Sequence, residues 1–284
     1  MKIAVLSDIH GNYIALKKCI IDAKEHNVDR YVFLGDYLGE FPYPHRTLDI
    51  LYKLMEEENC LFLKGNKEDY WINRRKNINC DWKDGNHSIA SMIYNYDNLK
   101  ESDFDFFESL LIAKRFEIDG HPPILFCHGS PENNSVKLLP NDEKTRNNLD
   151  CVKEDIIVCG HTHIEREFLV ENKRIINVGA VGVPLVEGGH KAQYMILESY
   201  TNEWKIEFRS VEYDISQVVK ELHESGLFDM TPYWCRITVH LLKTGKISHG
   251  SVLGEVMKAN DYKDPWYAIP EEYWDETLKK MGIE

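Results

Sequence analysis

Short apolar runs separated by polar segments fill the first 180 residues of the chain. The runs are rich in Val, Ile, Leu and Phe and show no regular alternation with polar residues. They lie in IAVLSDIH (3–10), YVFLGD (31–36), CLFLKGN (60–66), ILFCHG (124–129), DIIVCGHTH (155–163) and RIINVG (174–179). Such runs are typical of strands that are buried on both faces. We therefore predict six buried strands.

Two of the intervening segments have apolar residues at helical spacing. The first has Ile14, Leu16, Ile20, Ile21 and Ala23, and the second has Leu48, Leu51, Leu54 and Met55. This order predicts a β-α-β-α-β unit with parallel strands. Later, a DG turn within residues 115–129, and the adjacent runs 191–199 and 204–213, predict two antiparallel hairpins. The sheets should therefore be mixed.

Two regions depart from this pattern. Residues 68–111 are polar and aromatic, with helices predicted at 88–96 and 104–111, and they are a candidate cap over a site. Residues 215–230 predict a helix with one apolar face (Ile215, Val218, Val219, Leu222), which an aromatic-rich tail follows. We expect a main domain at 1–210 and an extension at 211–284 that packs on this domain or on a second subunit of a homo-oligomer.

Composition narrows the classes of protein. The chain has 284 residues, of which 43% are apolar, enough for a sizeable core. Its formal net charge of −13 disfavours stable nucleic-acid binding, which depends on many Lys and Arg contacts. The apolar run at the N-terminus is too short for a signal peptide or a membrane span. Seven cysteines without a CxxC motif fit reduced thiols, so we expect a cytoplasmic protein.

Polar side chains follow the predicted strands and form a candidate metal site. In open α/β sheets, ligands bind beyond the carboxyl ends of the strands. The side chains placed there are Asp8, His10, Asp36, Asn66, His128, His161 and His163. Oxygen and nitrogen donors of this kind suit Mn, Fe, Zn, Ni or Co, and we favour Mn. The spacing of two within each Asp-x-His or His-x-His pair directs both side chains to one side of an extended segment.

Seven ligands exceed the needs of one tetrahedral ion, but they suit two ions about 3.5–4 Å apart that share a carboxylate. Asp36 is the natural bridge. Two divalent ions, two aspartates and one bound hydroxide leave one net positive charge. This charge would attract an anionic phosphoester and stabilise the negative charge that develops as the metal-bound hydroxide attacks.

These residues lie in motifs that resemble the calcineurin-like metallophosphoesterase superfamily, in particular its small prokaryotic phosphodiesterase branch. The motifs are SDIHGN (7–12), GDYLG (35–39), GNKED (65–69), CHGSP (127–131), GHTH (160–163) and NVGAVG (177–182), and the resemblance spans residues 2–210. It implies a four-layer α/β/β/α sandwich of mixed sheets. It also implies that Asp8, His10, Asp36 and His163 hold one metal and that Asp36, Asn66, His128 and His161 hold the other. Asn12 would lie near the phosphate.

Lys67 departs from the family pattern. Many members have a histidine after the ligand asparagine, and this histidine contacts the phosphate and protonates the leaving oxygen. An ordinary lysine has a pKa near 10.4 and is a poor general acid at neutral pH. We expect Lys67 to bind phosphate oxygens as a fixed charge, with Asn66 and His128 at the reaction centre, which favours aryl esters and phosphoanhydrides. The alternative is a solvated surface side chain.

Other candidates for substrate binding follow Lys67. Arg74 and Arg75 could hold a polyphosphate, although such a charge run is usually a solvated helix face. Tyr70 and Trp71 could stack on a nucleobase, although core packing is the commoner role of aromatic residues.

The sequence therefore predicts a two-metal phosphoesterase that hydrolyses diester, monoester or anhydride bonds of small, nucleotide-like substrates. The alternative is a non-catalytic scaffold that keeps the same fold. Scaffold members of the family lose metal ligands, whereas the ligand set here is complete. A metallo-β-lactamase-type hydrolase would need an HxHxDH motif, which GHTHIE does not match.

Overall fold

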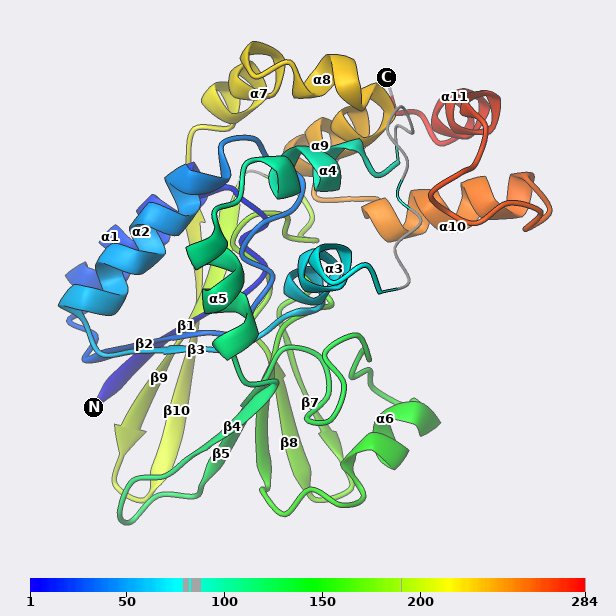
Figure 1. The fold of residues 1–284 in the computed structure, drawn as a ribbon. Helices are drawn as coiled ribbons and strands as arrows, with labels where there is room; N and C mark the ends of the chain where they lie inside the picture. The colour runs from blue at the N-terminus through cyan, green and yellow to red at the C-terminus, as the bar shows by residue number, and fades with distance from the viewer. Residues whose placement is uncertain (79–81, 83–87, 190, 284) are drawn as a thin grey trace.

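The computed structural model describes residues 1–78, 82, 88–189 and 191–283, which form two five-stranded sheets (Figure 1). The strand order of the first sheet is β10-β9-β1-β2-β3, and that of the second is β4-β5-β6-β8-β7. The strands are β1 (Lys2–Leu6), β2 (Arg30–Phe33), β3 (Cys60–Phe62), β4 (Ala113–Phe116), β5 (Ile124–Cys127), β6 (Ile156–Cys159), β7 (Arg166–Val170), β8 (Lys173–Asn177), β9 (Lys191–Tyr200) and β10 (Glu203–Glu212).

Each of the six apolar runs forms a strand. β1, β2 and β3 are mutually parallel, as are β5, β6 and β8. The hairpins β4–β5 and β9–β10 are antiparallel, so the prediction of mixed sheets is confirmed. The burial predicted for β3 was wrong, because β3 is the edge strand of its sheet and its residues are only partly buried.

The two sheets pack face to face, and helices cover their outer faces (Figure 1). Apolar residues of both sheets, including Val5 and Val32 of the first and Phe126 and Val158 of the second, form the core between them. Helices α1 (Tyr13–Glu25) and α2 (Pro44–Glu57) pack on the first sheet, and the short α6 (Glu143–Leu149) packs on the second. This arrangement is the four-layer sandwich that the resemblance implied.

The predicted apolar faces of α1 and α2 are correct except at one residue each. Ile20 and Leu54 are buried, but their neighbours Ile21 and Met55 are 52% and 42% exposed. Successive residues of a helix point about 100° apart, since a turn contains 3.6 residues. A rotation of this size carries Ile21 and Met55 off the buried face and toward water.

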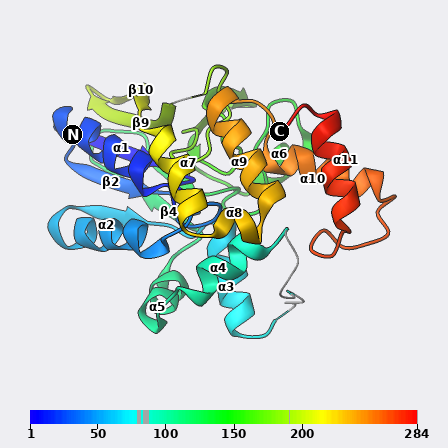
Figure 2. The same ribbon diagram turned by 90° about the horizontal axis from the view of Figure 1, so that it is seen from above.

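Helices fill the two regions outside the sheets. The insertion has α3 (Asn66–Arg75), α4 (Ala90–Asp97) and α5 (Glu101–Ser109), so both predicted helices are present. The extension has α7 (Ile215–Glu224), α8 (Leu227–Met230), α9 (Pro232–Thr244), α10 (His249–Ala259) and α11 (Glu271–Lys280), so its tail is helical (Figure 2). Apolar residues of α7 and α9 pack against Phe41 and Val183 of the main domain.

The structure bears on two expectations from composition, namely the reduced cysteines and the lack of a membrane span. Six of the cysteines are free thiols, and Cys80 lies outside the described residues. Among the described helices, none has both the length and the apolar character that crossing a membrane requires.

Asp22 on α1 ties this helix to the β9–β10 hairpin. Its carboxylate accepts hydrogen bonds from the Tyr194 hydroxyl at 2.6 Å and from Arg209 Nε and Nη2 at 3.1 and 2.9 Å. Burial alone would raise the pKa of Asp22, but the bonds from Arg209 and Tyr194 outweigh burial and lower it. We expect Asp22→Asn to reduce the free energy of unfolding by about 1–2 kcal/mol at pH 7, a value discounted for partial exposure.

The pH dependence of this effect has a defined sign. A carboxylate whose pKa is lower in the folded state stabilises the fold above its unfolded pKa, near 3.9 for aspartate, and loses that contribution as the pH falls through the folded pKa. The difference between the wild type and Asp22→Asn should therefore be steady near neutral pH and shrink below about pH 4. Urea unfolding at pH 7 and pH 3 tests this, and an undiminished difference at pH 3 would contradict it.

Candidate functional site

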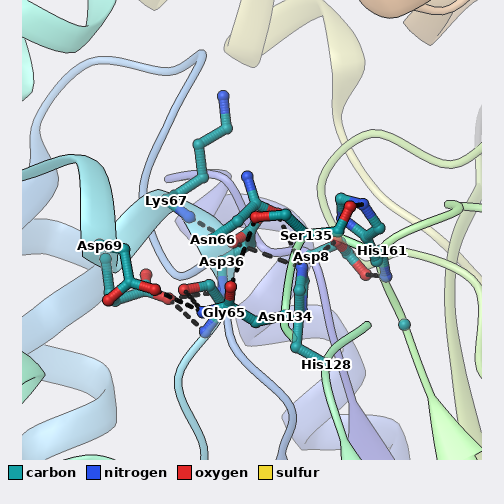
Figure 3. A network of polar contacts seen from close by, with 12 residues as sticks. Asp8, Asp36, Gly65, Asn66, Lys67, Asp69, His128, Asn134, Ser135 and His161 are labelled. Atoms are coloured by element: carbon teal, nitrogen blue, oxygen red, sulfur yellow. Dashed lines mark hydrogen bonds and ion pairs between the residues drawn. The ribbon is translucent and has the colours of Figure 1, made fainter. Parts of the chain in front are cut away.

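The seven predicted metal ligands lie just beyond the carboxyl ends of the strands, and the structure brings them together at one edge of the sandwich. Asp8 and His10 follow β1, Asp36 follows β2, and Asn66 begins α3 after β3. His128 follows β5, and His161 and His163 follow β6. Figure 3 shows Asp8, Asp36, Asn66, His128 and His161 around a common centre.

The first group of ligands comprises Asp8, His10 and His163, whose ligand atoms lie within 4.8 Å of one another. His163 Nε2 is 3.1 Å from Asp8 Oδ1, and His10 Nε2 is 3.7 Å from the same oxygen. A hydrogen-bond contact of 3.2 Å between His163 Nδ1 and the Val183 carbonyl leaves Nε2 to face the group. These three side chains could hold one metal ion.

The second group comprises Asp8, Asp36 and His128, again within 4.8 Å of one another. Asn66 Oδ1 lies 3.2 Å from His128 Nε2, which adds the predicted amide ligand. Asp36 directs one oxygen to each group, since Oδ1 is 3.5 Å from His128 Nε2 and Oδ2 is 3.6 Å from His10 Nε2. This geometry suits a bridging carboxylate. Asp8 also belongs to both groups, which the sequence did not suggest.

His161 stands apart from both groups. Its ring centroid is 5.1 Å from that of His128, but its Nε2 lies 3.1 Å from the Ser135 carbonyl. The backbone N–H of His161 donates to Asp8 Oδ2 at 3.0 Å. The structure therefore places His161 beside the second group, with one ring nitrogen facing a protein carbonyl.

The backbone explains how the side chains converge. Asp8, His10, Asp36, His161 and His163 all have positive φ, between 55° and 64°. The prediction that spacing by two on an extended segment aligns each pair was therefore wrong, because these residues adopt left-handed conformations. Such a conformation costs a non-glycine residue about 1–2 kcal/mol. It persists where the surrounding structure enforces it, often at functional sites.

Glycine at position 65 lets the loop after β3 approach Asp36. A Cβ atom there would lie 2.2 Å from Asp36 Oδ1 and 2.4 Å from Asp36 N. The Gly65 carbonyl accepts a hydrogen bond of 2.9 Å from Asn134 Nδ2, which also donates to Asp69 (Figure 3). Gly65 therefore fixes the distance between two ligand loops.

Glu68 is a buried residue that the sequence analysis did not single out. Its carboxylate accepts hydrogen bonds from the backbone N–H groups of Asp36, Tyr37 and Gly65, at 3.0, 2.9 and 2.8 Å. Burial, together with the charge of Asp36, raises the pKa of Glu68 to about 7. The available signal was its place at the third residue of α3, where an acid can bond back to the residue before the helix.

Glu40 is a second buried acid that was missed. One of its oxygens bonds His10 Nδ1, and the other lies 3.2 Å from Lys67 Nζ. A carboxylate on the far nitrogen of a metal-binding histidine fixes the orientation of the ring and raises its basicity. Glu40 directly follows the GDYLG motif, but the motif itself carries no signal for this contact.

We expect Glu40→Gln to weaken metal binding by about 10- to 100-fold, because the amide cannot supply the charge that orients His10. Calorimetric titration of metal-free protein with Mn²⁺ measures this affinity. Glu57→Gln is the matched control, since the Glu57 side chain is 51% exposed on α2. Unchanged Mn²⁺ affinity in Glu40→Gln would contradict the role of Glu40.

Unpartnered atoms show that a cation fits this site. Asp8 Oδ1 and His10 Nε2 are buried, and neither forms a hydrogen bond of ordinary geometry, although His163 Nε2 lies 3.1 Å from Asp8 Oδ1. Burial lowers the pKa of His10, but Glu40, Asp8 and Asp36 outweigh this effect and raise it to about 10. The site thus has a strongly negative potential, and its oxygen and nitrogen donors are the kind that transition metals bind. The residues present fit divalent metal ions.

Lys67 lies at the site, but it has an ionic partner there. Its side chain is 14% exposed and pairs with Glu40, so the alternative of a solvated surface lysine is wrong. Burial favours the neutral amine, but the negative charges of Glu40 and Asp36 outweigh burial and raise the pKa of Lys67. Lys67 is therefore a fixed positive charge beside the metal ligands.

The structure does not bring Arg74 and Arg75 to the site. Arg74 packs over the rings of Trp82 and Tyr96, and Arg75 pairs with Glu101 on α5. Both side chains therefore contact other parts of the insertion rather than the metal ligands. Trp71 is fully buried in the core, and the neighbouring Tyr70 is 38% exposed.

Asn12 has a structural role at the start of α1. Its Oδ1 accepts a hydrogen bond of 3.1 Å from the N–H of Ala15, which caps the helix, and its Nδ2 donates to the Gly182 carbonyl at 3.2 Å. Both ends of the amide are therefore engaged within the protein, and a contact between Asn12 and phosphate stays a prediction.

A pocket of about 230 Å³ opens onto the metal ligands. One wall contains His10, Asp36, Asn66, Lys67, His161 and His163. The opposite wall comes from the extension and contains Trp234, Leu241, Ser248, His249 and Gly250. None of the described residues of 68–111 lines the pocket, so the extension covers the site in place of the predicted cap.

Comparisons with known proteins agree with this geometry. The model of the calcineurin-like phosphoesterase superfamily domain matches residues 1–202. An uncharacterized protein of Methanocaldococcus jannaschii is 28% identical over 249 residues, which are 82% of this chain and 94% of that protein.

Two solved structures share the fold over 87% of this chain and 99% of their own chains. A hypothetical protein from Pyrococcus horikoshii has a TM-score of 0.70 at 19% identity. A metallophosphoesterase from Sphaerobacter thermophilus has a TM-score of 0.67 at 24% identity. With most of its length matched by the family model and its ligands gathered at one sheet edge, the chain belongs to the calcineurin-like phosphoesterase superfamily.

Proposed function

We propose that this protein is a two-metal phosphoesterase that hydrolyses phosphate esters or anhydrides of small molecules, nucleotides among them, with manganese as the favoured metal. One observation supports this most directly. The two groups of ligands share Asp8, and Asp36 directs one carboxylate oxygen to each group. Asp36 also lines the pocket.

The residues of the pocket have distinct roles in this proposal. His10, His163, Asp8 and Asp36 would hold one ion, and Asp8, Asp36, Asn66 and His128 would hold the other, with His161 beside them. When bound, such a metal pair polarises the phosphoryl group and supplies a nucleophile at neutral pH. Lys67 and Lys137 provide the positive side chains that line the pocket and can contact an anionic substrate.

The size of the pocket favours small substrates. Its volume of about 230 Å³ lies below the roughly 300–1,000 Å³ that is usual for drug-sized ligands. The extension lines the opposite wall, so a substrate must fit between the extension and the metal ligands. A non-catalytic scaffold would not need a complete ligand set with unpartnered buried atoms, so the hydrolase is the better supported function.

The direct test is hydrolysis of p-nitrophenyl phosphate and bis-p-nitrophenyl phosphate by protein that is stripped of metal and reloaded with Mn²⁺. His161→Ala is measured in parallel. We expect activity that requires metal and falls sharply in the variant, and the ratio of the two rates assigns the ester class. If Fe, Zn, Ni and Co also fail to restore any hydrolysis, and nucleotides are not hydrolysed either, the proposal is wrong.

Lys67→Ala should raise the KM of anionic esters by about tenfold, because one charge-assisted contact contributes roughly 1.5 kcal/mol. The effect on kcat should be smaller for p-nitrophenyl esters, since this leaving group needs little protonation. Steady-state kinetics with Lys64→Ala as the control measures both constants; Lys64 pairs with Asp69 and does not line the pocket. Wild-type kinetics in Lys67→Ala on both esters would contradict a phosphate contact.

A further inference from the structure

The wall opposite the metal ligands contains one polar ring among apolar side chains. His249 begins α10 and is 8% exposed. Its ring lies 4.8 Å from that of Trp234, and Leu185 and Leu241 line the pocket beside them. Both Trp234 and His249 belong to the extension, which the superfamily domain at residues 1–202 does not include. This wall is therefore a feature that the family's metal chemistry does not explain.

Hydrogen bonds determine which nitrogen of His249 carries its proton. The Thr238 hydroxyl donates its single proton to the Trp234 carbonyl at 2.9 Å. It must therefore act as the acceptor in its 2.8 Å contact with His249 Nε2. The ring donates through Nε2, so Nδ1 of the neutral imidazole bears a lone pair. Nδ1 has no hydrogen-bond partner within the described part of the chain.

The state of the ring agrees with this assignment. The pKa of His249 is lowered to about 4, and burial is the largest cause. Glu40 opposes this shift, whereas the charges of Lys67, His10 and His163 contribute to it. At neutral pH the ring is therefore uncharged and offers an acceptor at Nδ1. Such an atom cannot hydrogen-bond a phosphate oxygen that has no proton, but it can accept a bond from a hydroxyl or N–H group.

We propose that His249 and Trp234 form the subsite for the organic group of the substrate and select esters whose alcohol carries a hydroxyl close to the phosphate, such as a sugar or nucleoside. The phosphate then faces the metal ligands and Lys67. The sugar lies against the Trp234 ring, and one of its hydroxyls donates to His249 Nδ1. This inference rests on the proposed function, because it names the substrate class of the same site.

Ser248 and Lys137, which also line the pocket, do not provide an equivalent contact. Ser248 caps α10 through Ser251 N at 3.1 Å, so its oxygen is engaged. Lys137 is an exposed cation and suits the phosphate better than a neutral alcohol. Within the described residues that line the extension's wall, His249 thus supplies the free acceptor.

Matched pairs of esters test this selection in the Mn²⁺-loaded protein. For monoesters the pair is ribose 5-phosphate and phenyl phosphate, and for diesters it is thymidine 5′-(p-nitrophenyl phosphate) and phenyl p-nitrophenyl phosphate. We expect His249→Phe to raise the KM of the hydroxylated ester about tenfold, because one neutral hydrogen bond is lost. The KM of the phenyl ester should rise less than twofold. His249→Asn, whose amide oxygen can occupy the place of Nδ1, should keep the KM of the hydroxylated ester within about threefold of the wild-type value.

Thr238→Val provides an independent test of how the ring is held. Without the hydroxyl acceptor, His249 can change tautomer, so KM should rise for the hydroxylated ester alone. In the His249→Phe background, Thr238→Val should cause no further rise in KM, because Thr238 acts through His249. Melting temperature and Mn²⁺ stoichiometry, measured for every variant, establish that the fold and metal site are intact.

The outcomes separate the two proposals. If the wild type hydrolyses none of these esters, and the p-nitrophenyl phosphates and nucleotides also fail under every metal, the proposed function fails. If it hydrolyses those substrates but neither member of either pair, the subsite assignment alone is overturned. If it does hydrolyse the paired esters, and His249→Phe changes both members of the pair equally or changes neither, the subsite assignment is overturned. The assignment would also be overturned if His249→Asn raised the KM of the hydroxylated ester, relative to that of the phenyl ester, as much as His249→Phe does.

Discussion

Asp36→Asn should abolish metal-dependent hydrolysis and reduce the number of tightly bound metal ions. Asp36 directs Oδ2 toward His10 and Oδ1 toward His128, so one side chain serves both ligand groups. An asparagine of the same size removes one of two central negative charges and presents an NH₂ group to one ion. Because metal-ion catalysis contributes several kcal/mol, we expect kcat to fall by about 10³-fold or more.

Kinetics on p-nitrophenyl esters and metal analysis after gel filtration measure the two effects of Asp36→Asn. Asp105→Asn on α5 is the matched control, since its side chain is 76% exposed and its loss should alter neither quantity. If Asp36→Asn retained two ions for each chain and wild-type kcat, the bridging role would be excluded.

The fold could be predicted because its determinants are local. Each apolar run had the length and composition of a buried strand, and the helices between them had a regular apolar spacing. The edge position of β3 could not be seen in the same way, because Cys60, Leu61 and Phe62 are as apolar as residues of a central strand. Burial of a strand depends on its neighbours in the sheet, and those come from distant segments.

The convergence of the candidate metal ligands could be predicted because they follow strands and match family motifs, although their backbone geometry could not. Glu40 and Glu68 were missed for a physical reason. An acid in a loop or in the first turn of a helix is usually solvated, and only the tertiary structure shows that these two are buried against His10 and Asp36. His249 was also missed, because it lies far along the chain from the ligands that it faces across the pocket.

Contacts between helices also determine which basic residues of α3 lie at the site. Arg74 and Arg75 follow the metal segment by fewer than ten residues, but the helix carries them about two turns, roughly 10 Å, along its axis beyond Lys67. There their side chains meet aromatic and acidic residues of the insertion, whereas Lys67, at the start of α3, faces Glu40. Sequence proximity to a ligand therefore did not predict proximity to the site.

Glu68→Ala should cause the largest loss of stability among the substitutions considered. The carboxylate accepts three backbone hydrogen bonds, from Asp36, Tyr37 and Gly65, and the alanine would leave these three donors buried without a partner. Each unsatisfied group costs roughly 1–3 kcal/mol, so we expect the free energy of unfolding to fall by about 3–9 kcal/mol, a large part of the roughly 5–15 kcal/mol usual for a folded protein. Urea unfolding of metal-free protein measures the loss.

Two further variants distinguish the loss of the three hydrogen bonds from the loss of a negative charge. Glu57→Ala removes an exposed acid and should change stability by less than about 0.5 kcal/mol. Glu68→Gln keeps one oxygen that can accept two of the three bonds. Its free energy of unfolding should therefore lie between that of the wild type and that of Glu68→Ala. Because the three donors belong to the loops that hold Asp36 and Asn66, Glu68→Ala should also weaken Mn²⁺ binding. If its stability and its Mn²⁺ affinity both equalled those of Glu57→Ala, Glu68 could not be the residue that holds the two ligand loops together.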